Sequence, residues 1–192
     1  MKKVLLLLAN GFELYEAAAF IDVIGWNYCD GDKSTRLFTC GITKKVKTSF
    51  DQSVEVEYLV DEINVDQFDA LAITGGFEEY DYYRDAYSEK FSKLINDFNN
   101  KEKIIASICV AALPLGKSDI LRGKNATTYR GERQKQLSAF GVNVVDKPIV
   151  IEGKVITSWN PATAIDVALL LLEKLTDKQN AKHIREIMGF TS

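Results

Sequence analysis

The stretch KEKIIASICVAALPLGKSD, residues 101–119, contains an apolar run that ends at Cys109 and passes directly into small residues. Apolar side chains occupy consecutive positions of this run, which is typical of a parallel strand covered by helices on both faces. Ser107 and Ala111 lie two residues before and after Cys109, the spacing of the small residues around the nucleophile in the hydrolase pattern G-x-S-x-G. The stretch therefore predicts a buried parallel strand that turns sharply into a helix, with a thiol at the turn.

Similar apolar runs recur along the chain and alternate with helical patterns. Strands are predicted at residues 4–9, 37–41, 70–74, 104–108 and 155–158. Helices are predicted at residues 13–28, 88–99, 162–175 and 177–188. This alternation predicts an α/β fold with a doubly wound, mostly parallel sheet sandwiched by helices. Residues 44–58, KKVKTSFDQSVEVEY, contain two alternating stretches around a turn, which predicts a small antiparallel hairpin or edge excursion.

The C-terminal part of the chain is predicted to be helical. Pro161 is suited to open a helix at its first turn, and residues 162–175 are apolar on nearly every side. Such a helix is buried, either in the core of the chain or between subunits. The last predicted helix ends at Gly189.

Length and composition fit one ordinary globular unit. The 192 residues are 46% hydrophobic and 27% charged, which suits a single domain spanning residues 1–192. The net charge of −3 gives no electrostatic footprint for nucleic acid or an anionic membrane surface, so we expect neither as a partner. The first apolar run is too short for a signal peptide, and no segment approaches the ~20 apolar residues of a membrane span. We therefore expect a soluble, cytoplasmic protein.

The cysteines and the histidine limit the chemistry that is available. Cys29, Cys40 and Cys109 are widely spaced and form no C-x-x-C pair, so neither a disulfide framework nor a zinc site is indicated. The one histidine, His183, lies in the charged C-terminal helix, where a solvated position is usual. A single histidine cannot build a multi-histidine metal site, and we expect no metal or other cofactor. If Cys109 reacts, it does so without an evident histidine base.

Two interpretations of Cys109 remain open from its position alone. A thiol at the start of a helix is stabilised as the thiolate by the helix dipole and the free N–H groups, which lowers its pKa. The N–H of Val110 would then be free to bind an oxyanion. The alternative is an inert, buried thiol that packs as a small hydrophobe.

Gly75 and Gly76 follow the predicted strand at residues 70–74. Because glycines have no side chain, their N–H groups can approach a ligand closely, and Gly75 could supply a second oxyanion donor. The alternative is a tight turn between the strand and a loop.

Two acids near the first predicted helix differ in their expected roles. Asn10 as the N-cap and Glu13 three residues later could form a capping box, which is a structural role. Glu16 lies beyond the first turn of that helix, and its helical neighbours Phe12, Ala19, Phe20 and Val23 are apolar. A carboxylate on an apolar face is costly unless it is protonated or has a partner. A protonated Glu16 that donates a hydrogen bond to a thiolate would explain both groups; the alternative is a partly exposed glutamate at the helix edge.

Four segments of the chain together resemble the DJ-1/ThiJ/PfpI superfamily, whose fold is similar to the flavodoxin-like class I glutamine amidotransferases. The segments are VLLLLANGFELYEAAAFIDV (4–23), FDALAITGG (68–76), IASICVAALPLGKSDILRGKNATTY (105–129) and VITSWNPATAIDVALLLLEKL (155–175). The resemblance implies that Cys109 is the nucleophile-elbow cysteine and that Glu16 is the acid hydrogen-bonded to it. It implies that the N–H groups of Gly75 and Val110 are the oxyanion donors. It also implies a homodimer.

Members of the superfamily place further residues near the cysteine. By resemblance, the segment Trp159, Asn160 and Pro161 lies near the cysteine and the dimer contact, and Gly76 and Tyr129 are candidates for the pocket lining. Residues 77–87, FEEYDYYRDAY, are rich in tyrosines and acids, so this loop could be a lid or a solvated cover, and we favour the cover.

Three departures from the superfamily pattern narrow the function. Val110 stands where PfpI-like proteases and amidases have a histidine, and Tyr129 stands where many DJ-1-like members have one. SWNPAT, residues 158–163, stands where glutaminases have a histidine and a glutamate. An intracellular protease or amidase is therefore disfavoured. The resemblance favours a cysteine-dependent small-molecule hydrolase or a glyoxalase- or deglycase-like enzyme acting on a small carbonyl or amide substrate. The alternative is a redox sensor or stress-response binding protein that works through oxidation of Cys109.

Overall fold

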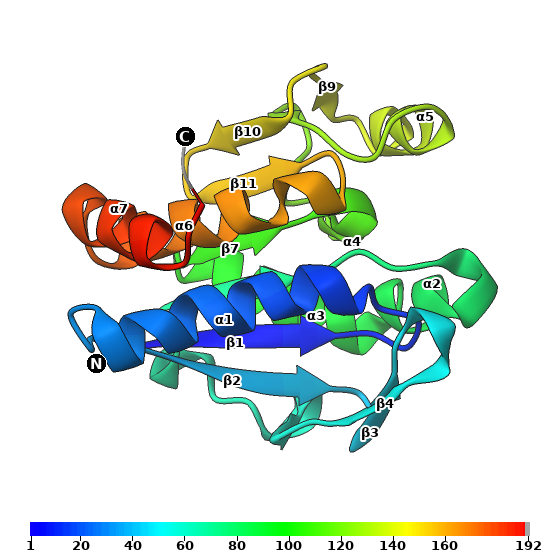
Figure 1. Cartoon of the computed structure of the whole chain (residues 1–192). Helices are drawn as coiled ribbons and strands as arrows, with labels where there is room; N and C mark the ends of the chain where they lie inside the picture. Colours follow the sequence, from blue (N-terminus) through cyan, green and yellow to red (C-terminus); the bar gives the residue numbers. More distant parts are fainter. Residues whose placement is uncertain (191–192) are drawn as a thin grey trace.

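The computed structural model describes residues 1–190, which contain a seven-stranded sheet of order β10-β11-β7-β6-β1-β2-β5 (Figure 1). Its strands are β1 (Lys2–Leu8), β2 (Thr35–Gly41), β5 (Tyr58–Leu59), β6 (Ala70–Ile73), β7 (Ile104–Ser107), β10 (Ile149–Glu152) and β11 (Val155–Ser158). All neighbouring pairs are parallel except β10 and β11. The predicted mostly parallel α/β sheet is therefore confirmed, and the five predicted strands correspond to β1, β2, β6, β7 and β11.

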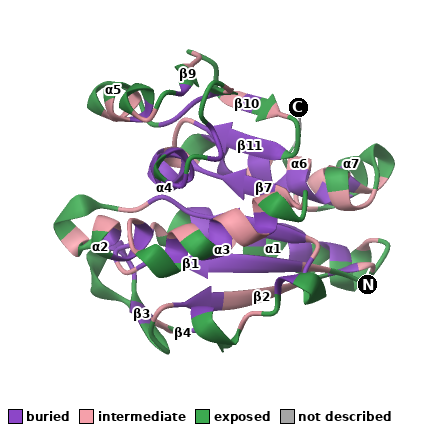
Figure 2. Cartoon of the chain, turned by 180° about the vertical axis from the view of Figure 1, so that it is seen from behind, coloured by how far each residue is buried: buried purple, intermediate pink, exposed green. Residues whose placement is uncertain are grey.

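Helices cover both faces of the sheet. They are α1 (Leu14–Asp30), α2 (Tyr82–Ala86), α3 (Glu89–Asn100), α4 (Ala112–Lys117), α5 (Glu132–Ala139), α6 (Ala164–Leu175) and α7 (Lys178–Ile187). One face packs against α1 and α6, which lie side by side, with α7 next to α6 (Figure 1). The other face packs against α3 and α4. Because both faces are covered, the central strands are buried along almost their whole length (Figure 2).

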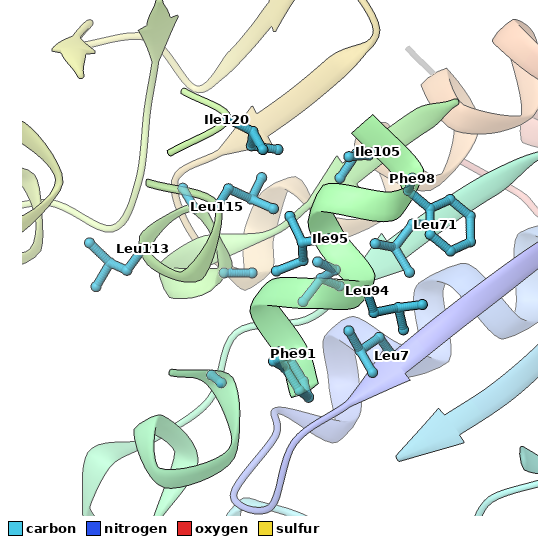
Figure 3. Packing of buried hydrophobic residues seen from close by; sticks show 14 of the residues in the cluster. Leu7, Leu71, Phe91, Leu94, Ile95, Phe98, Ile105, Leu113, Leu115 and Ile120 are labelled. Atoms are coloured by element: carbon cyan, nitrogen blue, oxygen red, sulfur yellow. The ribbon is translucent and has the colours of Figure 1, made fainter. Parts of the chain in front are cut away.

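Alternate residues of the central strands supply the two halves of the core. Leu5 and Leu7 of β1 belong to the same cluster as Phe91, Leu94 and Phe98 of α3. Figure 3 shows Leu7 facing α3. Their neighbours along the strand, such as Leu6, belong to the opposite cluster with α1 and α6. This two-sided burial explains why the strands are apolar at consecutive positions.

The smaller elements agree only in part with expectation. The predicted antiparallel hairpin is confirmed as β3 (Lys45–Lys47) and β4 (Ser53–Glu55). The sequence patterns did not identify α5, β10 or the short parallel pair of β8 (Asn125–Ala126) and β9 (Asn143–Val144).

Two local predictions about helices are corrected or resolved. The capping box of Asn10 and Glu13 is wrong, because Glu13 itself is the N-cap of α1 and makes no side-chain capping bond. The Asn10 side chain instead donates to Asp85 and accepts from the N–H of Lys47. The apolar helix α6 packs on α1 and α7, so most of its apolar surface is buried within the chain, while Ile165, Leu170 and Leu175 stay partly exposed. Within residues 1–190, no helix combines the length and apolarity needed to cross a bilayer.

Candidate active site

Cys109 lies on a strained turn at the carboxyl end of β7. Its φ of 59° is in the left-handed region, which is uncommon for a non-glycine residue and is often found at functional sites. A 3₁₀ turn, Cys109–Ala111, leads from β7 into α4, and the flanking side chains of Ser107 and Ala111 are fully buried. The Thr128 hydroxyl donates to the Cys109 carbonyl oxygen at 3.0 Å and holds the turn. The predicted sharp turn from strand to helix at the cysteine is confirmed.

Glu16 lies beside the thiol with its side chain fully buried. The helix begins at Leu14, so Glu16 is in the first turn of α1, not beyond it as expected. Its Oε2 accepts a hydrogen bond from the N–H of Gly75 at 2.7 Å. Its Oε1 is buried and makes no hydrogen bond of ordinary geometry among the described residues, although the carboxyl group does interact with the Cys109 thiol beside it. A carboxyl group in this environment has one oxygen fixed and the other oxygen left to carry a proton.

Gly75 is the residue that lets these groups meet. A Cβ at this position would lie 2.9 Å from Cys109 Cβ, 3.1 Å from the Val110 nitrogen and 3.2 Å from Glu16 Oε2. The first of these distances is too short for two carbon atoms. Gly75 therefore has to be a glycine for Cys109, Val110 and Glu16 to pack this closely, and its role as an oxyanion donor stays a prediction, because its N–H donates to Glu16.

Burial controls the protonation of the pair. It raises the pKa of Glu16 to about 8, and the hydrogen bond from Gly75 offsets only part of that shift. Burial, followed by the negative charge of Glu16, raises the pKa of the Cys109 thiol well above its ordinary value, although the N–H of Val110 acts in the opposite direction. The expected lowering of the thiol pKa is therefore wrong, because the helix start does not compensate for the loss of water.

The two groups consequently titrate as one unit. When the pair holds one proton, that proton lies either on the thiol, with Glu16 as the carboxylate, or on Glu16, with the sulfur as the thiolate. The proposed oxyanion donors differ in availability. Val110 N–H faces the sulfur, whereas Gly75 N–H is already engaged by Glu16.

A pocket of about 370 Å³ opens over the thiol. It is lined by Glu13, Glu16, Gly76, Phe77, Glu78, Glu79, Cys109, Val110, Tyr129, Arg133 and Pro161. The candidates Gly76, Tyr129 and Pro161 are thus part of the lining. Trp159 is not among the lining residues; its ring packs against the guanidinium of Arg130, which lies 3.8 Å from the ring centre.

Several lining residues were missed by the sequence patterns. Arg133 of α5 donates to Glu78 at 2.9 Å, and the Phe77–Glu79 segment forms part of the wall. The preference for a solvated cover at residues 77–87 is therefore wrong in part. Tyr82 of this loop is also fully buried and donates its hydroxyl to the Thr74 carbonyl oxygen at 2.7 Å.

His183 lies outside the pocket, as expected. It is exposed on α7, and its Nε2 is 3.3 Å from the carbonyl oxygen of Asp30. The pocket lining therefore contains no histidine that could act as a base for Cys109. Over residues 1–190, no group of three or more His, Cys, Asp or Glu side chains is arranged to hold a metal ion.

A family model described as the DJ-1/PfpI family matches residues 2–174, which include every residue of the pocket lining. The chain belongs to the DJ-1/PfpI family. The crystal structure of DJ-1beta from Drosophila melanogaster is similar with a TM-score of 0.87 and 26% identity, and the alignment covers 100% of this chain and 99% of that chain.

Two curated relatives match over part of their length. An uncharacterised protein of Methanocaldococcus jannaschii is 32% identical over 66% of this chain and 61% of its own length. A protein named Deglycase PfpI, from Pyrococcus furiosus, is 32% identical over 57% of this chain and 63% of its own length. The alignments thus cover less than two thirds of either relative.

Proposed function

We propose that the chain is a cysteine-dependent enzyme that acts on small carbonyl compounds by a glyoxalase- or deglycase-like reaction. In this proposal Cys109 is the nucleophile and Glu16 is its proton partner. The buried, unpartnered Oε1 of Glu16 beside the thiol carries the proposal, because it provides a place for the thiol proton inside the pocket. The name of the relative Deglycase PfpI adds support for the reaction class.

The first step is an addition. With one proton on the pair, Cys109 Sγ forms a bond to the carbonyl carbon and the π electrons of the carbonyl move to its oxygen. The proton of the pair passes to that oxygen, which gives a hemithioacetal and leaves Glu16 as the carboxylate. Val110 N–H stabilises the negative charge that develops on the oxygen.

For a 2-oxoaldehyde, the second step is a proton shift. The Glu16 carboxylate removes the proton from the carbon that carries sulfur and delivers it to the neighbouring ketone oxygen, which gives an enediol. Glu16 then takes the proton of the hydroxyl on the sulfur-bearing carbon and delivers it to the neighbouring carbon. The product is a thioester of a 2-hydroxy acid, so the two carbons exchange oxidation states without an external oxidant. Water then hydrolyses the thioester and restores the thiol. This scheme needs no histidine.

Methylglyoxal turnover tests the proposal. We expect Cys109→Ala to lose turnover and Glu16→Gln to lose about 100-fold or more, because the amide cannot accept the proton. Cys29→Ala is the matched control, since Cys29 is exposed on α1 and should behave as wild type. Equal rates in wild type and Cys109→Ala would overturn the proposal.

A redox sensor is the second candidate, and the lack of a histidine in the pocket favours it. Cys109 Sγ would attack peroxide, break the O–O bond and form a sulfenic acid with release of water. After mild peroxide, peptide mass analysis should show oxygen at Cys109 before Cys40, which is buried, and before Cys29. Oxygen distributed evenly over the three cysteines would count against this function.

Assembly and location are also proposals. We propose a cytoplasmic homodimer, on the ground of the family to which the chain belongs. The apolar surface of α6 gives little support for a dimer, because most of it is covered within one chain. Sedimentation of the purified chain as a monomer would overturn the dimer.

A further inference from the structure

The charged groups of the pocket are unbalanced. Glu13, Glu78 and Glu79 line it, whereas Arg133 is its one cation. Glu16 adds no charge while it is protonated. The lining therefore carries an excess of negative charge beside the nucleophile.

The positive charge of Arg133 is already balanced by an ion pair. Arg133 donates to Glu78 at 2.9 Å, and its guanidinium lies 5.0 Å from the ring centre of Tyr83. No Lys or Arg side chain among residues 1–190 forms an ion pair with Glu13 or Glu79. A negatively charged ligand would thus find no free cation in the lining and would face two unpaired carboxylates.

The small size of the pocket keeps its charged side chains close to a bound ligand. A volume of 370 Å³ corresponds to a sphere about 9 Å across, which is less than the Debye length at low ionic strength. The charges of the lining therefore act on any ligand held at Cys109.

Aromatic side chains stand among the carboxylates. Phe77 is 41% exposed and Tyr129 is 49% exposed, and both line the pocket. Aromatic faces together with carboxylates attract ammonium and guanidinium groups. Glu16, whose Oε1 has no hydrogen-bond partner among the described residues, belongs to the same lining.

We propose that the acidic lining selects ligands by charge, so that Cys109 reacts preferentially with electrophiles that carry an ammonium or guanidinium group and disfavours those that carry a carboxylate. The inference rests on the proposed function for its substrate class, which becomes carbonyl compounds bearing a positive charge. Glu13 and Glu79 act as specificity residues.

The test uses three methanethiosulfonates that share one reaction and differ in charge: the methyl, the trimethylammonium-ethyl and the sulfonatoethyl reagents. In each case the cysteine thiolate attacks the sulfenyl sulfur, a disulfide forms and methanesulfinate leaves. Peptide mass analysis gives the rate at Cys109, and exposed Cys29 in the same sample provides the reference. We expect a cation-to-anion rate ratio at Cys109 about tenfold above that at Cys29 at low ionic strength.

Two variants that remove charges of opposite sign from the pocket make the test decisive. Glu79→Gln should lower the ratio about threefold, and Arg133→Gln should raise it about threefold, because each changes the pocket by one charge. Glu102→Gln is the matched control, since Glu102 is exposed and precedes β7 at the end opposite Cys109. A ratio at Cys109 equal to that at Cys29, or equal effects of Glu79→Gln and Glu102→Gln, would overturn the inference.

The labelling test also separates this inference from the proposed function. A charge preference without turnover of any carbonyl compound would remove the proposed function and leave charge selection intact. Turnover of a carbonyl compound without a charge preference would support the proposed function and overturn charge selection.

Discussion

Replacing Glu16 by Gln should change how the stability of the folded chain depends on pH. Glu16 is fully buried, and its pKa is raised from 4.5 to about 8. Between these values the unfolded chain has released a proton that the folded chain retains, so rising pH favours unfolding. The stability tied to this proton is fully present below about pH 4.5, declines with rising pH and levels off above about pH 8.

The magnitude follows from the size of the shift. Each pKa unit corresponds to about 1.4 kcal/mol, so the folded wild type should lose about 3 kcal/mol between about pH 5 and about pH 8 through Glu16 alone. Gln keeps the shape of the side chain and can accept the hydrogen bond from Gly75, but it has no proton to release. Between about pH 5 and about pH 8, the free energy of unfolding of the variant should therefore rise by about 3 kcal/mol relative to that of the wild type.

Urea unfolding at fixed protein concentration, at about pH 5 and about pH 8, measures the free energy of unfolding of the wild type and of Glu16→Gln. Glu79→Gln is the control, because it removes an exposed carboxylate from the same pocket and should track the wild type. A constant difference between Glu16→Gln and wild type at both pH values would show that Glu16 ionises normally, and it would remove the protonated carboxyl from the site.

Three further predictions concern the surroundings of the pair. Gly75→Ala should cost about 1–3 kcal/mol of unfolding free energy, because its Cβ would lie 2.9 Å from Cys109 Cβ, whereas Gly25→Ala, which meets nothing within 4 Å, should not destabilise the chain in the same urea assay. Thr128→Val should cost about 1 kcal/mol and slow alkylation of Cys109, because it removes the hydrogen bond to the cysteine carbonyl; unchanged values of both would refute this. The rate of Cys109 alkylation should still be rising at about pH 8, because burial raises the thiol pKa, and a plateau near neutral pH would contradict the expected direction.

The sheet and the elbow could be predicted because their signals are local. Consecutive apolar residues identify a two-sided strand, and small residues around Cys109 identify a tight turn, without knowledge of the rest of the chain. The capping box failed for the opposite reason. Asn10 had the right spacing for a cap, but Asp85, which is 75 positions away, binds its side chain.

The pocket lining could not be predicted for the same reason, because contacts between distant segments form it. Arg133 belongs to α5, a helix with one buried residue, Leu137, so its pattern gives little helical signal. Glu78 and Arg133 are 55 positions apart, and only the fold brings them together. The direction of the Cys109 pKa shift also depends on burial by distant segments, whereas the sequence showed only the start of a helix.

The raised pKa values do not argue against a nucleophilic Cys109; they argue that the thiol and Glu16 must be treated as one acid. Gly75 N–H holds Oε2, and Oε1 is left without a hydrogen-bond partner among the described residues. An isolated thiolate in this buried site would be costly, and an isolated carboxylate would be equally so. A single negative charge shared by both groups is less costly than two, and it leaves a proton beside the sulfur that an incoming carbonyl oxygen can take.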